Sequence, residues 1–201
     1  NGPLGTAPCD YKLVFPNDDP FLGNNEATVC WPGLAQSDGI DNTGQQEQTS
    51  YWIAGQLGLP FNYRRYASFF LNGTQRSFIM EDVQKPDGDI LNQWYSNEPD
   101  GDLYKLSIWR EFANDSKNHT AVAPAALTNF ASGGVKRTAR YRWNWTPRAF
   151  QGTANTFSNL FALVDLVNTN NNYTASIESS VDIDQWMRIF AAEHIVGNWD
   201  S

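Results

Sequence analysis

The sequence is poor in cysteine and histidine, and it contains no long apolar run. Two cysteines and two histidines occur in 201 residues, and neither pair has the spacing of a zinc site. No apolar run approaches the ~20 residues that a membrane-spanning helix needs. We therefore expect no membrane span, and the predicted set of metal ligands is empty.

Basic residues are also scarce. The 14 lysines and arginines are outnumbered by 22 aspartates and glutamates, which gives a formal net charge of −8. Nucleic-acid binders carry a basic surface, so a nucleic-acid partner is disfavoured. The phosphate loop G-x-x-x-x-G-K-[ST], the G-x-G-x-x-G fingerprint and the G-x-S-x-G turn are all missing. Their absence excludes the enzyme classes that those motifs define.

Aromatic and polar uncharged residues take the place of the missing charges. Charged residues make up 18% of the chain, aromatic residues make up 14%, and there are 8 tryptophans. This Trp-rich composition is typical of secreted proteins, so we expect an extracellular or cell-surface location. Asn-x-Ser/Thr sequons, which carry glycans in secreted eukaryotic proteins and mean little in bacterial ones, begin at Asn72, Asn114, Asn118, Asn144 and Asn172.

Secretion also bears on the two cysteines. Cys9 and Cys30 are predicted to form a disulfide, because bridges persist in oxidising compartments. Two free buried thiols are the alternative. The chain begins at Asn1-Gly2-Pro3 without a signal peptide, so we expect either that a leader was removed or that the sequence is part of a larger parent chain.

Local patterns predict an α+β fold with an antiparallel sheet. Strands are expected at 11–15, 27–30 and 102–107, and the Asn72-Gly73 pair predicts a hairpin over 64–83. Helices are expected at 43–58, 87–94, 157–167 and 182–196, with a possible short helix in 121–130 and a polar loop at 168–174. We expect one domain over 1–201, with a sheet-rich part over roughly 1–110 and the start of a helical part over 111–201.

Five of the 14 basic residues lie between positions 136 and 148. Aromatic residues alternate with arginines in this segment. The pattern predicts a strand or extended segment that packs its aromatic side chains and leaves its cations in solvent. The alternative is a cationic surface for an anionic partner.

The stretch 181–201 carries the strongest functional pattern. Asp182 is a good helix N-cap, Gln185 completes a capping box, and Gly197 suits the helix end. The apolar spacing predicts one buried face, with His194 as a packed core histidine, made of Met187, Phe190, Ala191 and His194.

This helix would present Asp200 in a sharp turn. A carboxylate that follows a rigid helix and lies beside the bulky Trp199 is positioned to serve as a general base or a metal ligand. The alternative is that Asp200 is an ordinary turn or cap residue, since Asp is common after turns.

The stretch resembles the catalytic segment of the CotH (spore coat protein H) family of secreted, atypical protein kinases. The matching residues are Asp182, Asp184, Gly197, Asn198, Trp199, Asp200 and Ser201. Other segments resemble the family too: the strand 11–15 with 20–23, the Leu-Gly-Leu-Pro boundary at 57–60, the Leu-Asn-Gly turn that returns to Glu81, and the Leu-Tyr-Lys strand that ends at Lys105. The chain departs from the family at 76–78, where relatives usually show Gly-x-Tyr.

The resemblance implies a kinase-like fold and three roles. Asp200 would be the catalytic base, Lys105 would face the nucleotide phosphates, and Glu81 would hold that lysine. Lys105 and Glu81 are then predicted to lie within ion-pair reach on neighbouring strands of one antiparallel sheet. ATP and Mg²⁺ are the cofactors of the complete family domain. The family's metal-binding Trp-Asp-Leu-Asp stretch does not occur before Ser201, so we expect an incomplete domain that is inactive by itself.

Two functions stay open. The first is a secreted kinase that transfers phosphate from ATP to Ser or Thr of extracellular or coat proteins. The second is a non-catalytic binding or structural module, a surface or filament subunit built on a kinase-derived fold. The expected partner is a protein substrate in the first case and a neighbouring subunit in the second.

Overall fold

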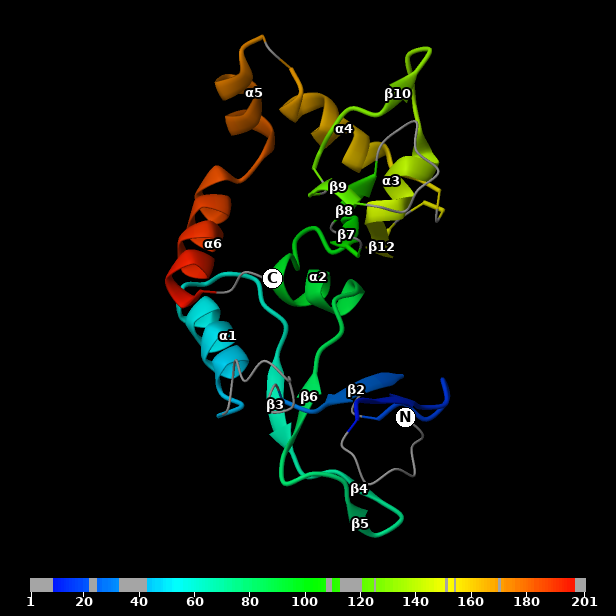
Figure 1. Cartoon of the computed structure of the whole chain (residues 1–201), viewed down its shortest axis with the longest axis vertical. Helices are drawn as coiled ribbons and strands as arrows, with labels where there is room; N and C mark the ends of the chain where they lie inside the picture. The colour runs from blue at the N-terminus through cyan, green and yellow to red at the C-terminus, as the bar shows by residue number, and fades with distance from the viewer. Residues whose placement is uncertain are drawn as a thin grey trace. The chain divides into compact units, whose positions relative to one another are not determined.

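The computed structural model of the chain describes residues 9–21, 25–32, 43–107, 110–112, 121–124, 126–150, 152–153, 155–169 and 171–197 (Figure 1). The fold is α+β, as predicted, and every described strand pair is antiparallel. The chain divides into two compact units. The first unit comprises Asn1–Lys85 and Gln185–Ser201, and the second comprises Pro86–Asp184. A family domain can contain two such units, so the expectation of one domain stays a prediction.

A four-stranded antiparallel sheet is the centre of the first unit. Its strands lie in the order β1 (Tyr11–Val14), β2 (Glu26–Cys30), β6 (Met80–Val83) and β3 (Arg64–Ala67). The outer strands β1 and β3 therefore flank a pair that is far apart in sequence. This sheet confirms the predicted strands at 11–15 and 27–30 and both arms of the predicted hairpin.

The register of this sheet sorts its side chains into two faces. Lys12 pairs with Thr28, Thr28 with Val83, and Val83 with Arg64. Because side chains alternate along a strand, residues two positions away lie on the same face as this row. We call this face of the sheet the charged face, and its ionisable residues include Lys12, Glu26, Arg64, Glu81 and Lys85.

The tip of the hairpin that joins β3 to β6 is a separate pair of short strands. Its strands are β4 (Phe70–Leu71) and β5 (Thr74–Gln75), and Asn72 and Gly73 form the turn with φ values of 51° and 76°. Two successive residues with positive φ match the twist of the flanking strands, which is why Asn-Gly predicts such turns.

Two helices, α1 (Gln46–Gln56) and α6 (Ile183–Val196), belong wholly or mostly to the first unit. Positive φ values of 65° at Gly58 and 67° at Gly197 follow their C-termini, as the sequence predicts. Tyr51 and Ala54 of α1 and Ile189, Ala192 and Val196 of α6 line a shared pocket of about 100 Å³.

The predicted buried face of α6 is wrong. Met187 is 62% exposed, Phe190 is 58% exposed, and His194 is exposed as well. The face that packs runs instead through Ile189, Ala192 and Val196. Both sets of residues have helical spacing, and the prediction from the sequence favoured the set with the larger side chains.

The second unit begins with α2 (Gly88–Trp94), whose N-terminal amide at Asp89 donates to the side chain of Asp87. Two strands and two helices surround a small core. The strand β7 (Leu103–Leu106) pairs with β12 (Trp145–Ala149). The helices α3 (Thr138–Asn144) and α4 (Ser158–Val167) supply buried residues of this core. Two short sheets and one helix complete the unit: β8 (Arg110–Phe112) with β9 (Ala121–Pro124), β10 (Ala131–Ser132) with β11 (Val135–Lys136), and α5 (Tyr173–Ser180).

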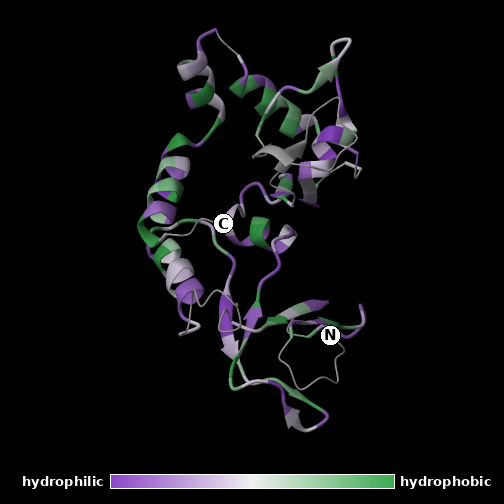
Figure 2. Ribbon diagram, viewed as in Figure 1, coloured by the Kyte–Doolittle hydropathy of each residue, from purple (hydrophilic) through white to green (hydrophobic). Residues whose placement is uncertain are grey.

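Aromatic residues form the core of this unit. Its buried members are Tyr141, Phe157, Leu160 and Val164, and Figure 2 shows the apolar character of α4, which supplies the last two. The Tyr141 hydroxyl donates to the Thr128 carbonyl and accepts from the Phe130 amide, both at 2.9 Å. A buried phenol with both partners is satisfied.

Three local predictions in the second unit are wrong. Residues 121–124 form a strand rather than a helix, because they pair with β8, a contact that local propensity does not record. Residues 138–144 form α3 rather than an extended segment, since Tyr141 turns into the core. Residues 173–180 form α5 where a loop was expected up to 174.

The predicted disulfide is also wrong, because Cys9 and Cys30 are free. Tyr11 pairs with Val29, so continued register would place Asp10, not Cys9, opposite Cys30. Neighbouring residues on a strand point to opposite faces, which directs the two thiols apart. Burial, and then the Asp10 carboxylate, raises the pKa of Cys30 to about 11.

No helix in the described part of the chain is long and apolar enough to cross a membrane.

Candidate functional site

Glu81 lies on β6, in the middle of the first unit's sheet, and is fully buried. Its register neighbours on the two sides are Cys30 on β2 and Tyr66 on β3. A buried carboxylate is costly unless cations or hydrogen-bond donors surround it. Its partners therefore decide what it can do.

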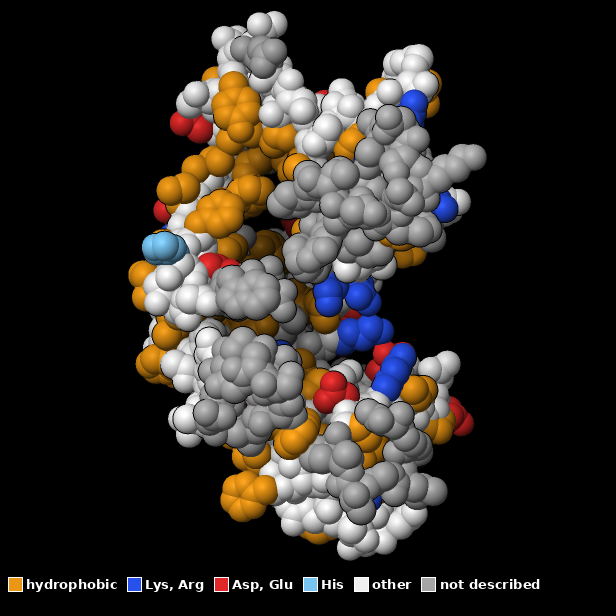
Figure 3. Space-filling view, in the orientation of Figure 1, with side chains coloured by type: hydrophobic (Ala, Val, Ile, Leu, Met, Phe, Trp, Pro, Cys, Tyr) orange, Lys and Arg blue, Asp and Glu red, His pale blue; other side chains and the backbone are white. Residues whose placement is uncertain are grey.

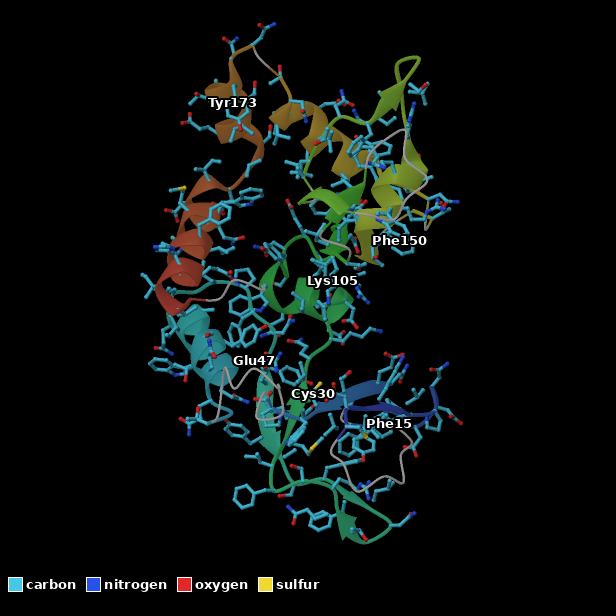
Figure 4. All side chains as sticks on the ribbon, in the orientation of Figure 1. Phe15, Cys30, Glu47, Lys105, Phe150 and Tyr173 are labelled. Atoms are coloured by element: carbon cyan, nitrogen blue, oxygen red, sulfur yellow. The ribbon has the colours of Figure 1, made fainter. Side chains whose placement is uncertain are left out.

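Both oxygens of the Glu81 carboxylate are engaged. Gln48 Nε2 donates to Oε1 at 2.9 Å, and Arg64 Nη1 donates to Oε2 at 2.8 Å. Arg64 also forms an ion pair with Glu47, which Figure 4 shows on α1. We call Glu47, Gln48, Arg64 and Glu81 the Glu81 network. It fixes α1 to the charged face of the sheet.

Electrostatics keeps Arg64 charged in this network. Burial alone would lower the pKa of Arg64, but Glu47, Tyr51 and Glu81 outweigh it and raise that pKa above its ordinary value. The guanidinium also lies over the Tyr51 ring, 5.2 Å from its centroid. One cation thus balances two carboxylates, of which Glu47 is the more exposed.

A hollow of about 330 Å³ lies beside the network. Its lining combines two aromatic rings with amide and hydroxyl groups, from Gln45, Gln48, Thr49, Trp52 and Tyr66. Trp52 is 64% exposed, so this is an open depression on α1 and β3 rather than an enclosed cavity.

Lys105 lies on β7 in the second unit, where Figure 4 labels it. It pairs with Thr146 of β12, and its side chain is exposed. Tyr104 alternates onto the other face, where it packs against the core. Lys105 therefore points away from that core and is accessible to an anion.

Tyr104, next to Lys105, is anchored to its surroundings. Its hydroxyl contacts the Thr156 carbonyl at 3.3 Å and Asp102 Oδ2 at 3.4 Å. Burial, and then the Asp102 carboxylate, raises the pKa of Tyr104 to about 12. The phenol stays neutral at physiological pH and holds β7 in place.

The prediction that Glu81 and Lys105 lie on neighbouring strands of one sheet is wrong. Glu81 belongs to the four-stranded sheet and Lys105 to the separate pair β7–β12. The ion-pair partner of Glu81 is Arg64, from the adjacent strand of its own sheet. Arg64 and Gln48 were missed, although hairpin register alone places Arg64 on the face of Glu81.

Asp200, the predicted catalytic base, lies outside the described residues, as do Asn198, Trp199 and Ser201. The helix that leads to them is described. It spans Ile183–Val196 and ends at Gly197 with positive φ. This confirms the helix and its predicted end at Gly197, and the turn that follows and the role of Asp200 stay predictions.

Metal ligands do not converge within the described ranges. No group of three or more His, Cys, Asp or Glu side chains there could hold a metal ion. Asp82 pairs with Arg65, and Glu26 with two lysines. The described residues therefore do not fit a magnesium site.

The antiparallel sheet with its Asn-Gly hairpin, followed by mainly helical segments, is consistent with a kinase-like α+β fold. Comparison with known families agrees: the family described as CotH kinase protein matches residues 36–201. The chain belongs to the CotH kinase family. No curated protein and no solved structure matches it.

The matched region contains every residue of the predicted site, including Glu81, Lys105 and Asp200. Family membership supports a kinase-like function in general.

Proposed function

We propose that this protein is a secreted kinase that transfers the γ-phosphoryl group of ATP to Ser or Thr of extracellular or coat proteins. The family match over residues 36–201 carries this proposal. In the reaction the substrate hydroxyl oxygen forms the new bond to the γ-phosphorus, its proton passes to Asp200, and ADP leaves. Such transfer relies mainly on positioning and charge stabilisation.

Within this proposal, Lys105 faces the phosphates of ATP. Two observations support the assignment: the lysine is exposed, and it lies on the outer face of a strand whose other face is anchored in a core. Because the other face of β7 packs on a core, the backbone that carries Lys105 is held in place.

The test is ATP binding by calorimetry. We expect Lys105→Ala to weaken ATP binding by about tenfold, because it removes a charge-assisted contact to phosphate. Arg65→Ala is the matched control, since Arg65 is an exposed cation paired with Asp82. Equal ATP affinity in wild type and Lys105→Ala would remove Lys105 from the site.

A second candidate function is a non-catalytic surface or filament subunit. One observation favours it: both oxygens of Glu81 are occupied by Gln48 and Arg64, so the carboxylate has a structural role that needs no nucleotide lysine. Exposed aromatic side chains such as Phe78, at 93% exposure, would suit subunit contacts. The absence of ATP binding by the wild-type protein would favour this function.

We also propose an extracellular location. The exposure of the sequons makes it testable, because Asn72 and Asn172 are exposed, whereas Asn144 is only 1% exposed. A glycan cannot be accommodated on a buried side chain. In a glycosylating host we expect mass spectrometry to find glycans at Asn72 or Asn172 and none at Asn144. Unmodified sites throughout would contradict secretion through that route.

A further inference from the structure

The charged face of the first unit's sheet differs between its two ends. At the α1 end, the Glu81 and Arg64 side chains are 1% and 16% exposed. At the other end, Lys12 is 58% exposed, Lys85 is 41% exposed and Glu26 is 35% exposed. Figure 3 shows basic and acidic side chains gathered over this part of the sheet.

The three exposed groups form one linked cluster. Lys12 Nζ lies 2.9 Å from Glu26 Oε1, and Lys85 Nζ lies 2.9 Å from Glu26 Oε2. The register explains the contact: continued pairing of β2 with β6 places Lys85 directly opposite Glu26, and Lys12 is the diagonal neighbour on the same face. One carboxylate therefore holds two ammonium groups, one from β1 and one from the segment that follows β6.

We propose that Lys12 and Lys85 form a binding site for a polyphosphate chain, such as that of a nucleoside triphosphate or inorganic tripolyphosphate. The inference deepens the proposed function and, where the ligand is ATP, rests on it. It assigns these phosphate contacts to residues of the first unit alone.

The hydrogen-bonding capacity of the cluster suits this ligand. Each ammonium has three N–H donors, and within the described residues each spends one on Glu26. The remaining donors can bind phosphate oxygens without breaking either ion pair. Each lysine bonds to a different oxygen of the Glu26 carboxylate. The two ammonium groups are therefore spaced to contact neighbouring phosphates of one polyphosphate chain.

The charge of the cluster also favours an anion. Lys12, and then Lys85, lowers the pKa of Glu26 to about 2, so at neutral pH the cluster carries two positive charges and one negative. The net charge of the whole chain is −8. At physiological ionic strength, however, screening acts over about 8 Å. The two lysines therefore contribute more to the electrostatic potential at the cluster than distant carboxylates do.

Titration calorimetry of the full chain with inorganic tripolyphosphate tests the site. We expect Lys12→Ala and Lys85→Ala each to weaken binding by about threefold or more, because each removes one charge at short range. Glu26→Gln should strengthen binding, since it removes the only negative charge of the cluster. Arg65→Ala, a cation on the opposite face of the same sheet, should leave the affinity unchanged.

Circular dichroism shows whether each variant is folded, and Glu26→Gln gives a second readout in the opposite direction. No binding of tripolyphosphate by the wild type, or equal binding by the wild type and both lysine variants, would overturn the inference. A weakening in Arg65→Ala equal to that in the lysine variants would overturn it too, because it would reveal only general charge attraction.

Parallel titrations with ATP separate this inference from the proposed function. If tripolyphosphate binds through both lysines but ATP binds no more tightly and is unaffected by Lys105→Ala, the phosphate site stands and the ATP role falls. If ATP binds through Lys105 alone, the kinase proposal stands and the Lys12–Lys85 site falls.

Discussion

At the scale of single residues, the central observation is a buried carboxylate whose two described hydrogen-bond partners belong to its own unit. Glu81 is matched by Arg64 and Gln48, and Arg64 is shared with Glu47. Buried ion pairs contribute little net stability, but removing one partner leaves an uncompensated charge. The network therefore acts mainly to fix the geometry between α1 and the sheet.

The replacement Glu81→Gln tests this role. We expect the free energy of unfolding to fall by about 2–4 kcal/mol, because Arg64 stays buried with only the more exposed Glu47 to balance it. Urea denaturation measures the change. The control is Asp82→Asn on the same strand, whose partner Arg65 is 58% exposed, and the expected cost there is below about 1 kcal/mol. Equal effects of the two variants would contradict the network's structural role.

At the scale of elements, the hairpin tip is the clearest case in which local chemistry determines structure. Gly73 has φ of 76° and Asn72 has φ of 51°. We expect Gly73→Ala to destabilise the protein by about 1 kcal/mol or more, because alanine is strained at this φ. Asn72→Gly should be nearly neutral, since glycine adopts a left-handed conformation freely. Thermal unfolding of the two variants checks the contrast, and a neutral Gly73→Ala would refute it.

The elements that the sequence predicts well are those with their own local signals. The Asn72-Gly73 turn, the helices ending before Gly58 and Gly197, and the amphipathic α4 all have such signals. The elements predicted wrongly depend on distant partners. The strand β9 exists because it pairs with β8, and α3 exists because Tyr141 enters a core shared with α4. No local pattern contains those contacts.

The same distinction holds for the candidate site. The resemblance to the family predicts Asp200, Glu81 and Lys105 as site residues, and their roles stay predictions. Hairpin register could have placed Arg64 on the face of Glu81, but the contact of Gln48 could not be predicted, because Gln48 approaches from α1, 33 positions away in the chain. The Lys12–Glu26–Lys85 cluster likewise depends on sheet order, which joins β1 and β6 on either side of β2.

At the scale of the whole molecule, the two compact units divide the candidate residues. Glu81 and the Lys12–Lys85 pair lie in the first unit, and Lys105 lies in the second. Asp200 lies outside the described residues.

The most direct test of the kinase proposal is radiolabel transfer from γ-labelled ATP to a Ser-rich protein, with Mg²⁺ and the protein at its full natural length. We expect Asp200→Asn to lower the transfer rate by about 10²-fold or more, because it removes the general base, while calorimetric ATP affinity stays nearly unchanged. Asp165→Asn, at an exposed carboxylate paired with Lys136, should keep full activity. Undiminished transfer by Asp200→Asn would contradict the account and leave Asp200 as a turn residue.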